Sequence, residues 1–483
     1  MKAETVSLNY TLENLLAEVL RRVSPAPEDR RRIKGLAERL KDRVEGALKA
    51  AGLHGELRVE GSLAKNTWLT DSADIDIFIR VPPEVDREAF GTDYLKAAKE
   101  ATTGFEQIER FSEHPYLEVL VNGVRINVVP CYSVEKGAWK SATDRTPFHT
   151  DYVKPKLDDE LCGQIRLLKQ FMKGIGVYGS EMKVGGFSGY LCELLILHYH
   201  TFLQALKAAS SWRPRTMIYL EDSKLTVEEY EGNLVIVDPV DEKRNAASAV
   251  TKQRLNEFIG ASREFLNQPR LTFFYPPGIP SLSTEILLQT FNQRGATLAF
   301  IEFKKVNAVS DVVWGQLYKS QRVLRRLVEA HDFHVVSDGV WADETCRGIF
   351  LLELEERQKP LMQKTIGPPL QMKEECENFL RKHSASPSTL WGPKIEGDRW
   401  IVGITRKYSE IVKLLRSELK KGGREKGIAE LVSRAFTDEP GILIGEEIVP
   451  FYRKNKDFAE FLTEHLYGRP RWLKMNLTRS ESL

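Results

Sequence analysis

Residues 58–81, RVEGSLAKNTWLTDSADIDIFIRV, carry the strongest structural signal in this chain. Residues 58–60 predict the end of a strand, Gly61-Ser62 predicts a turn, and residues 63–68 predict one or two helical turns. A helix that begins directly after such a turn points its free N–H groups and the positive end of its dipole at one spot. The sequence therefore predicts a corner that suits a phosphate group.

The second half of this stretch alternates acidic and apolar residues. A period of two places Asp74 and Asp76 on one strand face and Ile75 and Ile77 on the other. The rise of a strand separates the two acidic residues by about 6–7 Å at the backbone. Both carboxylates can then converge on a hard cation, which prefers oxygen ligands. An ordinary solvated strand carries the same pattern, so the interpretation of the pair as a cation site depends on the Gly-Ser turn that precedes it.

A β-hairpin is predicted over residues 116–129. Alternating apolar runs flank Asn122-Gly123, and this dipeptide is the strongest short hairpin signal. A two-residue turn sets a register in which Glu118 lies directly opposite Asn127. Strands mixed with helices predict an α/β or α+β catalytic module.

Further elements are predicted along the rest of the chain. The helices lie at 8–23, from Ile33 to near Gly52, and at 86–102, 189–206, 312–330 and 373–381. The strands lie at 234–237, 298–303, 334–336, 348–354 and 400–404. The first of these strands leads into a polar turn, 238–245, that is expected to open another helix. Prolines interrupt the periodicity at 262–280, where we expect a domain boundary.

Composition indicates a soluble globular protein with several domains. At 483 residues, with 42% apolar and 29% charged residues, the chain is too long for one core. No apolar run reaches the ~18–20 residues of a membrane span, and the N-terminus lacks an apolar signal core. We therefore expect a cytoplasmic protein that binds no membrane. The scattered cysteines, expected to be reduced and mostly buried, are Cys131, Cys162, Cys192, Cys346 and Cys376.

The net charge of +2 is nearly neutral, so a nucleic-acid surface requires local sorting of Lys and Arg. Basic and aromatic residues alternate near the C-terminus, which favours a stripe that binds an RNA backbone over a merely solvated surface. The stripe comprises Arg406, Lys407, Lys413, Arg416, Lys420, Lys421, Arg424, Lys426, Arg453, Lys454, Lys456, Arg469, Arg471 and Lys474, with Tyr408, Tyr452, Tyr467 and Trp472. Basic residues of the second helix, among them Arg30, Lys34 and Lys41, are expected to be a solvated helix face.

Several motifs together resemble one family, the archaeal-type (class I) CCA-adding enzymes. These are tRNA nucleotidyltransferases of the polymerase-beta-like superfamily. The motifs are Gly61-Ser62 with Asn66-Thr67-Trp68, Asp74-x-Asp76, His114-Pro115-Tyr116, Val128-Val129-Pro130-Cys131-Tyr132, Asp144-Arg145-Thr146-Pro147-Phe148-His149, Gly186-Phe187-Ser188-Gly189-Tyr190-Leu191-Cys192-Glu193 and Asp238-Pro239-Val240-Asp241-Glu242-Lys243-Arg244-Asn245. The resemblance spans nearly the whole chain.

The resemblance implies template-independent addition and repair of the 3′-terminal CCA of tRNA. The substrates are CTP and ATP, the catalysts are two Mg²⁺ ions, and pyrophosphate is released. A multidomain α/β (α+β) fold is implied, with a polymerase-beta-like nucleotidyltransferase head over 1–150. A helical neck similar to that of oligoadenylate synthetases, over 151–265, completes the nucleotide pocket. Body and tail domains over 266–483, the tail at roughly 297–400, bind the acceptor and T arms of tRNA. Homodimers are usual in this family.

The resemblance also assigns roles to single residues. Asp74, Asp76 and position 127 hold metal, and the Gly-Ser turn binds the triphosphate. Lys65 stands where the family often has Arg, which keeps the charge but loses the bidentate fork. Arg244 matches an arginine that presents a hydrogen-bonding edge to the incoming base, although a surface charge at a helix start is the competing interpretation. The implied nucleotide-binding residues are Gly61, Ser62, Lys65, Thr146, His149, Lys169, Tyr178 and Arg244.

One position departs from the family. The third metal-binding carboxylate is replaced by Asn127, a neutral amide that leaves the site less negative. Three explanations are open: a deliberate Asp-to-Asn change that traps substrate, a natural relative with weakened or no activity, or a carboxylate supplied from elsewhere. Glu118 is the candidate for the third explanation, because cross-strand partners have Cβ atoms about 4.5–5.5 Å apart. An ordinary polar strand residue is the competing interpretation of Glu118.

Two alternative functions follow from the same residues. An oligo- or poly(A)-type RNA nucleotidyltransferase shares the catalytic motif, but the 238–244 block and the long basic C-terminal region favour CCA addition. A catalytically impaired relative that only binds tRNA is supported by Asn127 alone.

Overall fold

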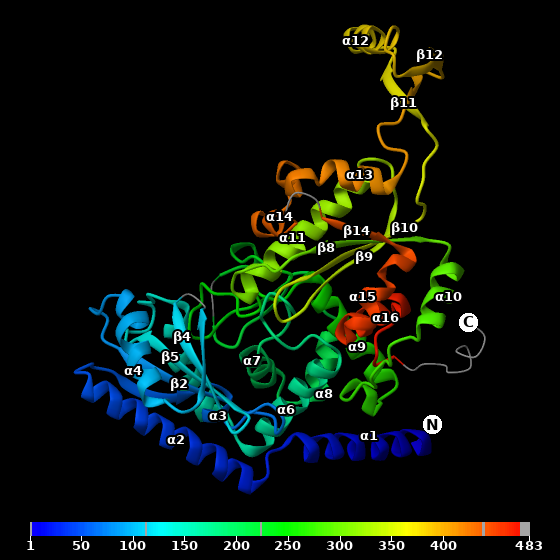
Figure 1. Ribbon diagram of the computed structural model, residues 1–483. Helices are drawn as coiled ribbons and strands as arrows, with labels where there is room; N and C mark the ends of the chain where they lie inside the picture. The colour runs from blue at the N-terminus through cyan, green and yellow to red at the C-terminus, as the bar shows by residue number, and fades with distance from the viewer. Residues whose placement is uncertain (1, 112–113, 223–224, 437–439, 474–483) are drawn as a thin grey trace. The chain divides into compact units, whose positions relative to one another are not determined.

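The computed structural model describes residues 2–111, 114–222, 225–436 and 440–473 (Figure 1). The chain forms two compact units, one running up to Gly278 and joined by the segment from Pro470, the other formed by Ile279–Arg469. The predicted head and neck therefore fold as one unit. Lys474 of the predicted basic stripe lies outside the described residues. No helix within the described ranges has the length and apolar character needed to cross a membrane.

The first unit opens with two helices, α1 (Lys2–Val23) and α2 (Pro27–Ala50). A five-stranded sheet follows, in the order β1 (Glu56–Glu60), β2 (Asp74–Val81), β5 (Val124–Tyr132), β4 (Pro115–Val121) and β3 (Glu106–Phe111). The apolar stripe of α2, which includes Ile33, Leu40 and Val44, packs in one core with Ile75 and Ile77. Because α2 covers the isoleucine face, the alternation predicted for β2 leaves its acidic residues on the other face.

The predicted hairpin register is confirmed, because β4 pairs antiparallel with β5 and sets Glu118 opposite Asn127. Strand β2 pairs in parallel with β5 and aligns Asp76 with the same Asn127. The helix after the Gly-Ser turn, α3 (Gly61–Ala64), begins two residues earlier than predicted. The single helix predicted over 86–102 is wrong in its first part, since a π-helical segment (Phe90–Tyr94) precedes α4 (Leu95–Ala101).

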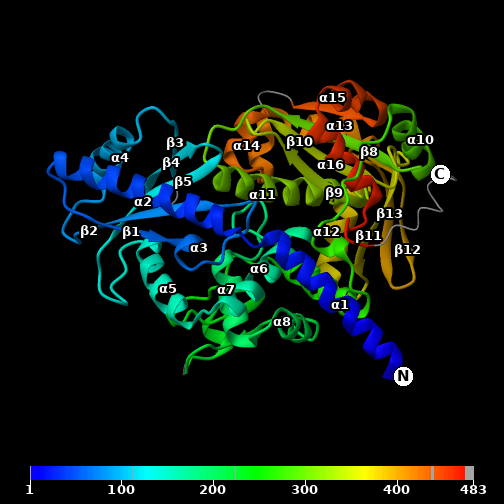
Figure 2. The ribbon, with the colours of Figure 1, turned by 90° about the horizontal axis from the view of Figure 1, so that it is seen from below.

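The helical part of the first unit surrounds an aromatic core built from Phe171, Phe202, Phe265, Phe273 and Phe274. Its elements are η2 (Ala142–Asp144), α5 (Arg145–Val153), η3 (Lys154–Lys156), α6 (Asp159–Gly174), α7 (Gly189–Tyr199), α8 (Phe202–Ala209), β6 (Thr216–Ile218), η4 (Val227–Glu229), β7 (Leu234–Ile236), α9 (Lys252–Asn267) and η5 (Leu271–Phe273). In Figure 2, α5, α6, α7 and α8 lie beyond strand β1, at the edge of the sheet opposite β3.

The polar turn after β7 does not open a helix directly, which corrects the prediction. Helix α9 begins only at Lys252, where Thr251 caps it. The turn is instead held by the side chain of Asn245, which accepts bonds from the backbone N–H groups of Ile236 and Ala247. Local side-chain bonds of this kind compete with helix formation. Arg244 is therefore not a charge at a helix N-terminus.

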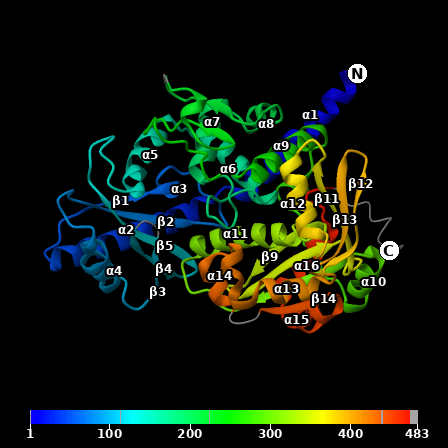
Figure 3. The same ribbon diagram turned by 90° about the horizontal axis from the view of Figure 1, so that it is seen from above.

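The second unit contains two sheets. The larger has the order β14 (Gly441–Ile444), β8 (Thr297–Phe303), β10 (Gly348–Leu354) and β9 (Val335–Ala342), with α11 (Ser310–Glu329) packed against it (Figure 3). The smaller has the order β11 (Met362–Pro369), β13 (Arg399–Thr405) and β12 (Thr389–Glu396). The remaining elements are α10 (Thr284–Arg294), α12 (Lys373–His383), α13 (Ile411–Glu418), η6 (Lys420–Lys426), α14 (Glu430–Ala435), η7 (Gly445–Ile448), α15 (Val449–Lys454) and α16 (Lys456–Tyr467).

Most aromatic residues of the predicted basic stripe are buried. Tyr408, Tyr452 and Trp472 belong to hydrophobic cores, and the ring of Trp472 stacks on Phe273 at 5.0 Å. Only Tyr467 of the four is exposed. These burial values remove three aromatic rings from the surface, so base stacking is not the role of those side chains in this conformation.

Candidate nucleotide and metal site

The Gly-Ser turn lies directly against Asp76. Gly61 has a φ of +71°, and a Cβ atom built on it would lie 2.2 Å from Oδ2 of Asp76. Only glycine fits there, because any side chain would collide with the carboxylate. Ser62 follows in the first turn of α3, and its carbonyl accepts a hydrogen bond from the Thr67 N–H at 2.9 Å. The chain therefore brings the Gly61-Ser62 turn, predicted to suit a phosphate, into contact with Asp76, a predicted cation ligand.

The charged forms of the Asp74 and Asp76 carboxylates are disfavoured by their surroundings. Burial raises the pKa of both side chains, and the charge of Asp74 raises that of Asp76 further. Asn127 opposes this shift by donating a hydrogen bond from Nδ2 to Oδ1 of Asp76, at 2.9 Å. Two carboxylates and the remaining amide oxygen are donors that a hard divalent cation accepts. The residues therefore fit such a cation with two carboxylates and one amide oxygen, in place of three carboxylates.

Glu118 lies opposite Asn127, as its register requires, but its carboxylate is engaged elsewhere. Arg110 donates a hydrogen bond to Glu118 at 2.9 Å, and Arg125 lies 3.6 Å away. Across the described part of the chain, no three His, Cys, Asp or Glu side chains form a group that could hold a metal ion. Compensation for Asn127 by Glu118 stays a prediction.

A buried group of charges joins the sheet to the helices. Glu193 on α7 accepts hydrogen bonds from Lys65 at 2.5 Å, from Thr67 at 2.5 Å and from Lys169 at 3.2 Å. Lys169 on α6 also donates to the backbone carbonyl of Thr67 at 3.1 Å. Burial works against the charged form of Glu193, but the two lysines lower its pKa to about 2. Two cations therefore share one buried carboxylate.

The hydroxyl of Tyr178 lies beside this group, close to Gly189, the first residue of α7. A Cβ atom on Gly189 would lie 3.0 Å from the Tyr178 hydroxyl and 3.5 Å from Nζ of Lys169. Burial raises the pKa of Tyr178, so its hydroxyl stays protonated. The structure thus brings together Lys65, Lys169 and Tyr178, three of the residues assigned to the nucleotide.

A second group is organised by the buried carboxylate of Asp238. Arg244 donates to its Oδ2 at 2.6 Å, His149 Nε2 lies 3.0 Å from the same oxygen, and the Tyr190 hydroxyl donates to Oδ1 at 3.0 Å. The rings of His149 and Tyr190 stack at 3.9 Å. Burial opposes ionisation of Asp238, but its hydrogen bond with His149 and the charges around it hold the pKa well below its usual range. Arg244 is thereby fixed with part of its side chain accessible.

Lys65 connects the two groups, because its ammonium lies 5.7 Å from the centre of the Tyr190 ring. Burial lowers the pKa of His149 by more than its contact with Asp238 raises it, so its imidazole is neutral near pH 7. Thr146 lies on α5 one turn before His149. The Gly-Ser turn, the acidic pair and both buried groups thus belong to one site.

Three residues of this site were assigned no role from the sequence: Glu193, Tyr190 and Asp238. A signal for Glu193 was present, because a carboxylate inside the apolar helix GYLCELLILHY requires a buried partner. Nothing local to Asp238 indicated that it would organise His149, which is 89 residues away.

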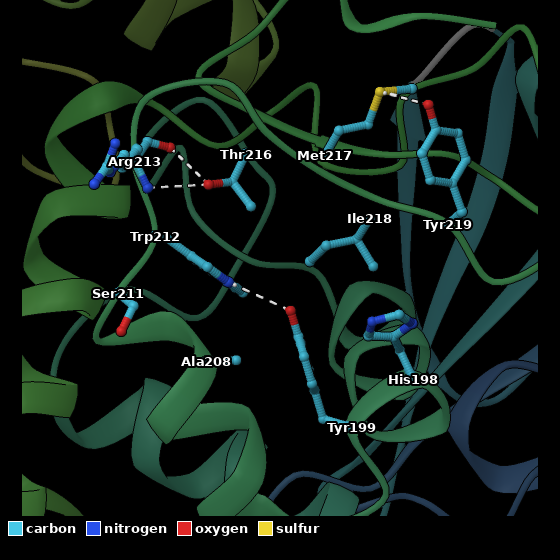
Figure 4. Close-up of a pocket in the computed structure, with 10 residues that line it drawn as sticks. All are labelled: His198, Tyr199, Ala208, Ser211, Trp212, Arg213, Thr216, Met217, Ile218 and Tyr219. Atoms are coloured by element: carbon cyan, nitrogen blue, oxygen red, sulfur yellow. Dashed lines mark hydrogen bonds between the residues drawn. The ribbon is translucent and has the colours of Figure 1, made fainter.

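A separate cavity of about 450 Å³ lies between the ends of α7 and α8 and strand β6 (Figure 4). Its lining is mostly aromatic and aliphatic, with Tyr199, Trp212 and Tyr219 around it, and Trp212 donates to the Tyr199 hydroxyl at 3.4 Å. None of the residues assigned to nucleotide or metal lines it.

Three family models match the chain. They are the nucleotidyltransferase domain over residues 34–149, the second domain of tRNA nucleotidyltransferase over 163–275, and the C-terminal domain of CCA-adding enzyme over 294–441. The first two cover the sheet and the helices that form the site described above.

The chain is also similar over most of its length to curated proteins. The CCA-adding enzyme of Methanosarcina barkeri is 37% identical over 431 residues, which are 88% of this chain and 93% of that protein. The CCA-adding enzyme of Methanothermobacter thermautotrophicus is 36% identical over 458 residues, which are 93% and 97% of the two chains. Among solved structures, that of E. coli MS115-1 CdnC with ATP is 19% identical, with a TM-score of 0.41, and the match covers 54% of this chain and 94% of that one.

Proposed function

This chain belongs to the CCA-adding enzymes, and we propose that the Gly61 corner, the acidic pair and the Asp238 group perform their reaction here. The function is template-independent addition of CCA to the 3′ end of tRNA from nucleotide substrates. The observation that supports the residue assignment most strongly is the contact between Gly61 and Asp76, since it sets a phosphate-binding turn beside a cation ligand. The curated relatives of similar length carry the activity in their names.

Enzymes with nucleotidyltransferase domains typically use a divalent metal, and we propose two Mg²⁺ ions held by Asp74, Asp76 and the amide oxygen of Asn127. Such ions supply charge that activates the attacking 3′ hydroxyl and steadies the departing pyrophosphate. The side chains supply position. Gly61 gives the triphosphate close access to the backbone, and Ser62 offers a hydroxyl to it. Little covalent chemistry falls to the protein in such a transfer.

The buried lysines contribute electrostatically. Lys65 and Lys169 both pair with the single carboxylate of Glu193, at 2.5 and 3.2 Å, and burial lowers the pKa of Lys169. In a site of low dielectric a lysine held in this way attracts a triphosphate without direct contact. The replacement of Arg by Lys at position 65 suits this arrangement, since the ammonium needs only one short contact to Glu193.

Base recognition falls to the Asp238 group. Asp238 holds Arg244 and His149 in fixed positions, and a fixed donor can read the hydrogen-bonding edge of a base. Neutral His149, stacked on Tyr190, offers a planar surface beside it. We propose that this group selects CTP and ATP.

One assay tests the function. The protein is incubated with tRNA lacking CCA, with CTP, ATP and Mg²⁺, and the product is resolved at single-nucleotide length. Extension by three nucleotides, with CTP required before ATP, is expected. Extension by A alone contradicts CCA addition and favours a poly(A)-type enzyme.

A second candidate, a tRNA-binding relative with impaired catalysis, is favoured by one observation, the amide at position 127. Binding of the acceptor and T arms by residues 266–483, a homodimer and a cytoplasmic location also remain proposals. Gel filtration with light scattering tests the dimer.

A further inference from the structure

A second cavity, of about 610 Å³, lies in the first unit at the open edge of strand β1. Helices α2 and α5 and the α3 segment form its walls, and Figure 2 shows α2, β1, α3 and α5 as neighbours. None of the residues assigned above to nucleotide or metal lines it. Its lining comprises Arg30, Lys34, Ala37, Glu38, Lys41, Leu57, Arg58, Val59, Leu63, Ala64, Asn66, Trp68, Thr150, Asp151 and Lys154.

The charged residues that line this cavity are mostly basic. Five cations from α2, β1 and the end of α5 converge on it, against the carboxylates of Glu38 and Asp151. Glu38 already pairs with Lys41 at 2.9 Å, and Asp151 pairs with Arg58 at 2.6 Å. Glu60, just behind the lining, also lies 2.8 Å from Arg58. Each of these acidic groups is therefore already paired with a cation.

Three cations of the lining have no acidic partner among the described residues. Arg30 donates only to the backbone carbonyl of Pro25, at 3.1 Å, and in the described chain Lys34 and Lys154 form no ion pair. Both lysines are exposed, so they are free to turn toward a ligand. The cavity therefore carries cations without an ion-pair partner on helix α2 and just after helix α5.

A buried cation lies behind the same wall. Arg166 on α6 is 2% exposed, yet within the described ranges it forms no ion pair with a carboxylate and donates to carbonyl oxygens of Asn66 and Trp68. Burial lowers the pKa of Arg166, and the charge of Arg30 adds to this effect while Cys162 and Asp159 oppose it. A buried charge without a counter-charge is costly. An anion in the cavity would relieve the repulsion between the two arginines.

We propose that this cavity binds a compact phosphate-bearing anion, such as pyrophosphate or the triphosphate of a free nucleotide, at a site distinct from the catalytic one. A volume of about 610 Å³ is that of a small-molecule site. The cations converge from three elements onto one space, whereas an RNA backbone needs an extended row of them. The apolar part of the lining, with Leu57, Val59 and Leu63, accommodates the less polar part of a nucleotide.

The site would communicate with the catalytic turn through Asn66. This residue adopts a left-handed conformation with φ of +53°, and Arg166 donates to both its backbone and side-chain oxygens. Its neighbour Thr67 donates to the Ser62 carbonyl and to Glu193. A ligand that attracts Arg30 or Arg166 would therefore shift Asn66 and Thr67, the segment that is hydrogen-bonded to Ser62.

Calorimetric titration of the full-length protein with pyrophosphate tests the proposal. EDTA is present, so that the catalytic site lacks the cation it needs to hold a phosphate chain. Lys34→Ala with Lys154→Ala is compared with a matched pair, Arg31→Ala with Lys252→Ala. The matched pair removes the same charge from exposed residues that do not line the cavity. We expect pyrophosphate affinity to fall at least tenfold in the first variant and less than twofold in the second.

Equal losses in the two variants, or no loss in either, would overturn the proposal, since binding would then follow overall charge or another site. Fluorescence titration with tRNA lacking CCA tests whether the cavity binds the phosphate backbone of RNA instead of a small phosphate-bearing anion. If the cavity variant loses tRNA affinity and keeps its affinity for pyrophosphate, the surface binds RNA and the proposal is wrong. Because no step depends on nucleotide incorporation, the outcome is independent of the proposed catalytic roles.

Discussion

The side-chain amide of Asn127 donates a hydrogen bond to the carboxylate of Asp76, with 2.9 Å between Nδ2 and Oδ1. The parallel pairing of β2 with β5 aligns the two residues, so the sheet itself fixes this contact. The bond stabilises the charged form of Asp76 without a cation. A carboxylate at position 127 would repel Asp76 until a cation bound between them. The residue at this position therefore sets how strongly the site attracts metal.

Asn127→Asp is expected to raise the rate of CMP incorporation at saturating Mg²⁺ at least tenfold, because a third carboxylate completes the set around the cation. Without metal the same variant should be less stable than the parent, since two buried carboxylates then face each other. Incorporation of labelled CTP into tRNA lacking CCA, across a Mg²⁺ titration, measures the first effect, and thermal unfolding in EDTA measures the second. An unchanged rate with intact tRNA binding would favour the impaired relative.

Glu118→Gln is expected to change the rate less than threefold, because Arg110 already holds the carboxylate. The measurement is kcat at limiting and at saturating Mg²⁺. A loss of tenfold or more at limiting Mg²⁺, which disappears in the Asn127→Asp background, would instead support compensation across the hairpin. Glu109→Gln, on the neighbouring strand β3 and paired with Lys99, is the control.

Gly61→Ala is expected to lower kcat/KM more than 100-fold, because the new methyl group would overlap Oδ2 of Asp76. Gly104→Ala is a matched control, since Gly104 also has a positive φ, +93°, but has no atom within 4 Å of the added Cβ. Both variants share the backbone strain of about 1–2 kcal/mol. If the two lose activity equally, strain and not contact with Asp76 explains the loss.

Glu193→Gln is expected to destabilise the fold at neutral pH by about 3–5 kcal/mol, because it leaves Lys65 and Lys169 without a buried counter-charge. The pKa of Glu193 is about 2 in the folded chain, against 4.5 for an ordinary glutamate side chain. A lowered folded pKa stabilises above pH 4.5, and this contribution, of order 3 kcal/mol, is lost as the pH falls toward 2.

Urea unfolding at pH 7, 5, 4 and 3 measures that contribution. The parent should lose stability over this range more steeply than the Gln variant, which lacks the titrating carboxylate. Glu257→Gln, part of a more exposed pair with Arg254, should follow the parent. Parallel pH curves for the parent and Glu193→Gln would show that the carboxylate is not held as described.

Asp238→Asn is expected to raise the KM for both CTP and ATP about 10–100-fold, since charge-assisted bonds of about 1.5–3 kcal/mol to Arg244 and His149 are weakened. The KM for tRNA should not change. Asp241→Asn is the control, because Asp241 lies in the same turn but pairs with Arg145 at 2.8 Å. Steady-state kinetics with each substrate varied separately distinguish the two. Equal effects of both variants would mean that the whole turn, rather than Asp238, positions the nucleotide.

The local features of the site could be predicted because short-range rules determine them. The period of two in 74–79 decides which face of β2 is acidic, and the two-residue turn at Asn122-Gly123 decides that Glu118 meets Asn127. Strand β3 was missed, since EQIERF is largely exposed and lacks alternating apolar residues. The helix expected after 238–245 failed because the side chain of Asn245 occupies the backbone groups around it.

The long-range pairs could not be predicted in the same way. Glu193 meets Lys65 across 128 residues, and the sequence near Glu193 says only that some buried partner must exist. The burial of Trp472 against Phe273 likewise depends on a contact between residues far apart in the sequence, which local periodicity does not predict. Topology of this kind comes from the whole core, and no window of ten to twenty residues contains it.

The ion pair between Lys65 and Glu193 also constrains how the protein is made. A ribosome that adds about 5–20 residues per second delivers Lys65 roughly 6–26 s before the partner that lies 128 residues later. A nascent chain that already holds the complete sheet must keep that lysine in water until α7 emerges. Translation order therefore delays assembly of the Lys65–Glu193 pair until well after the acidic strand has been synthesised.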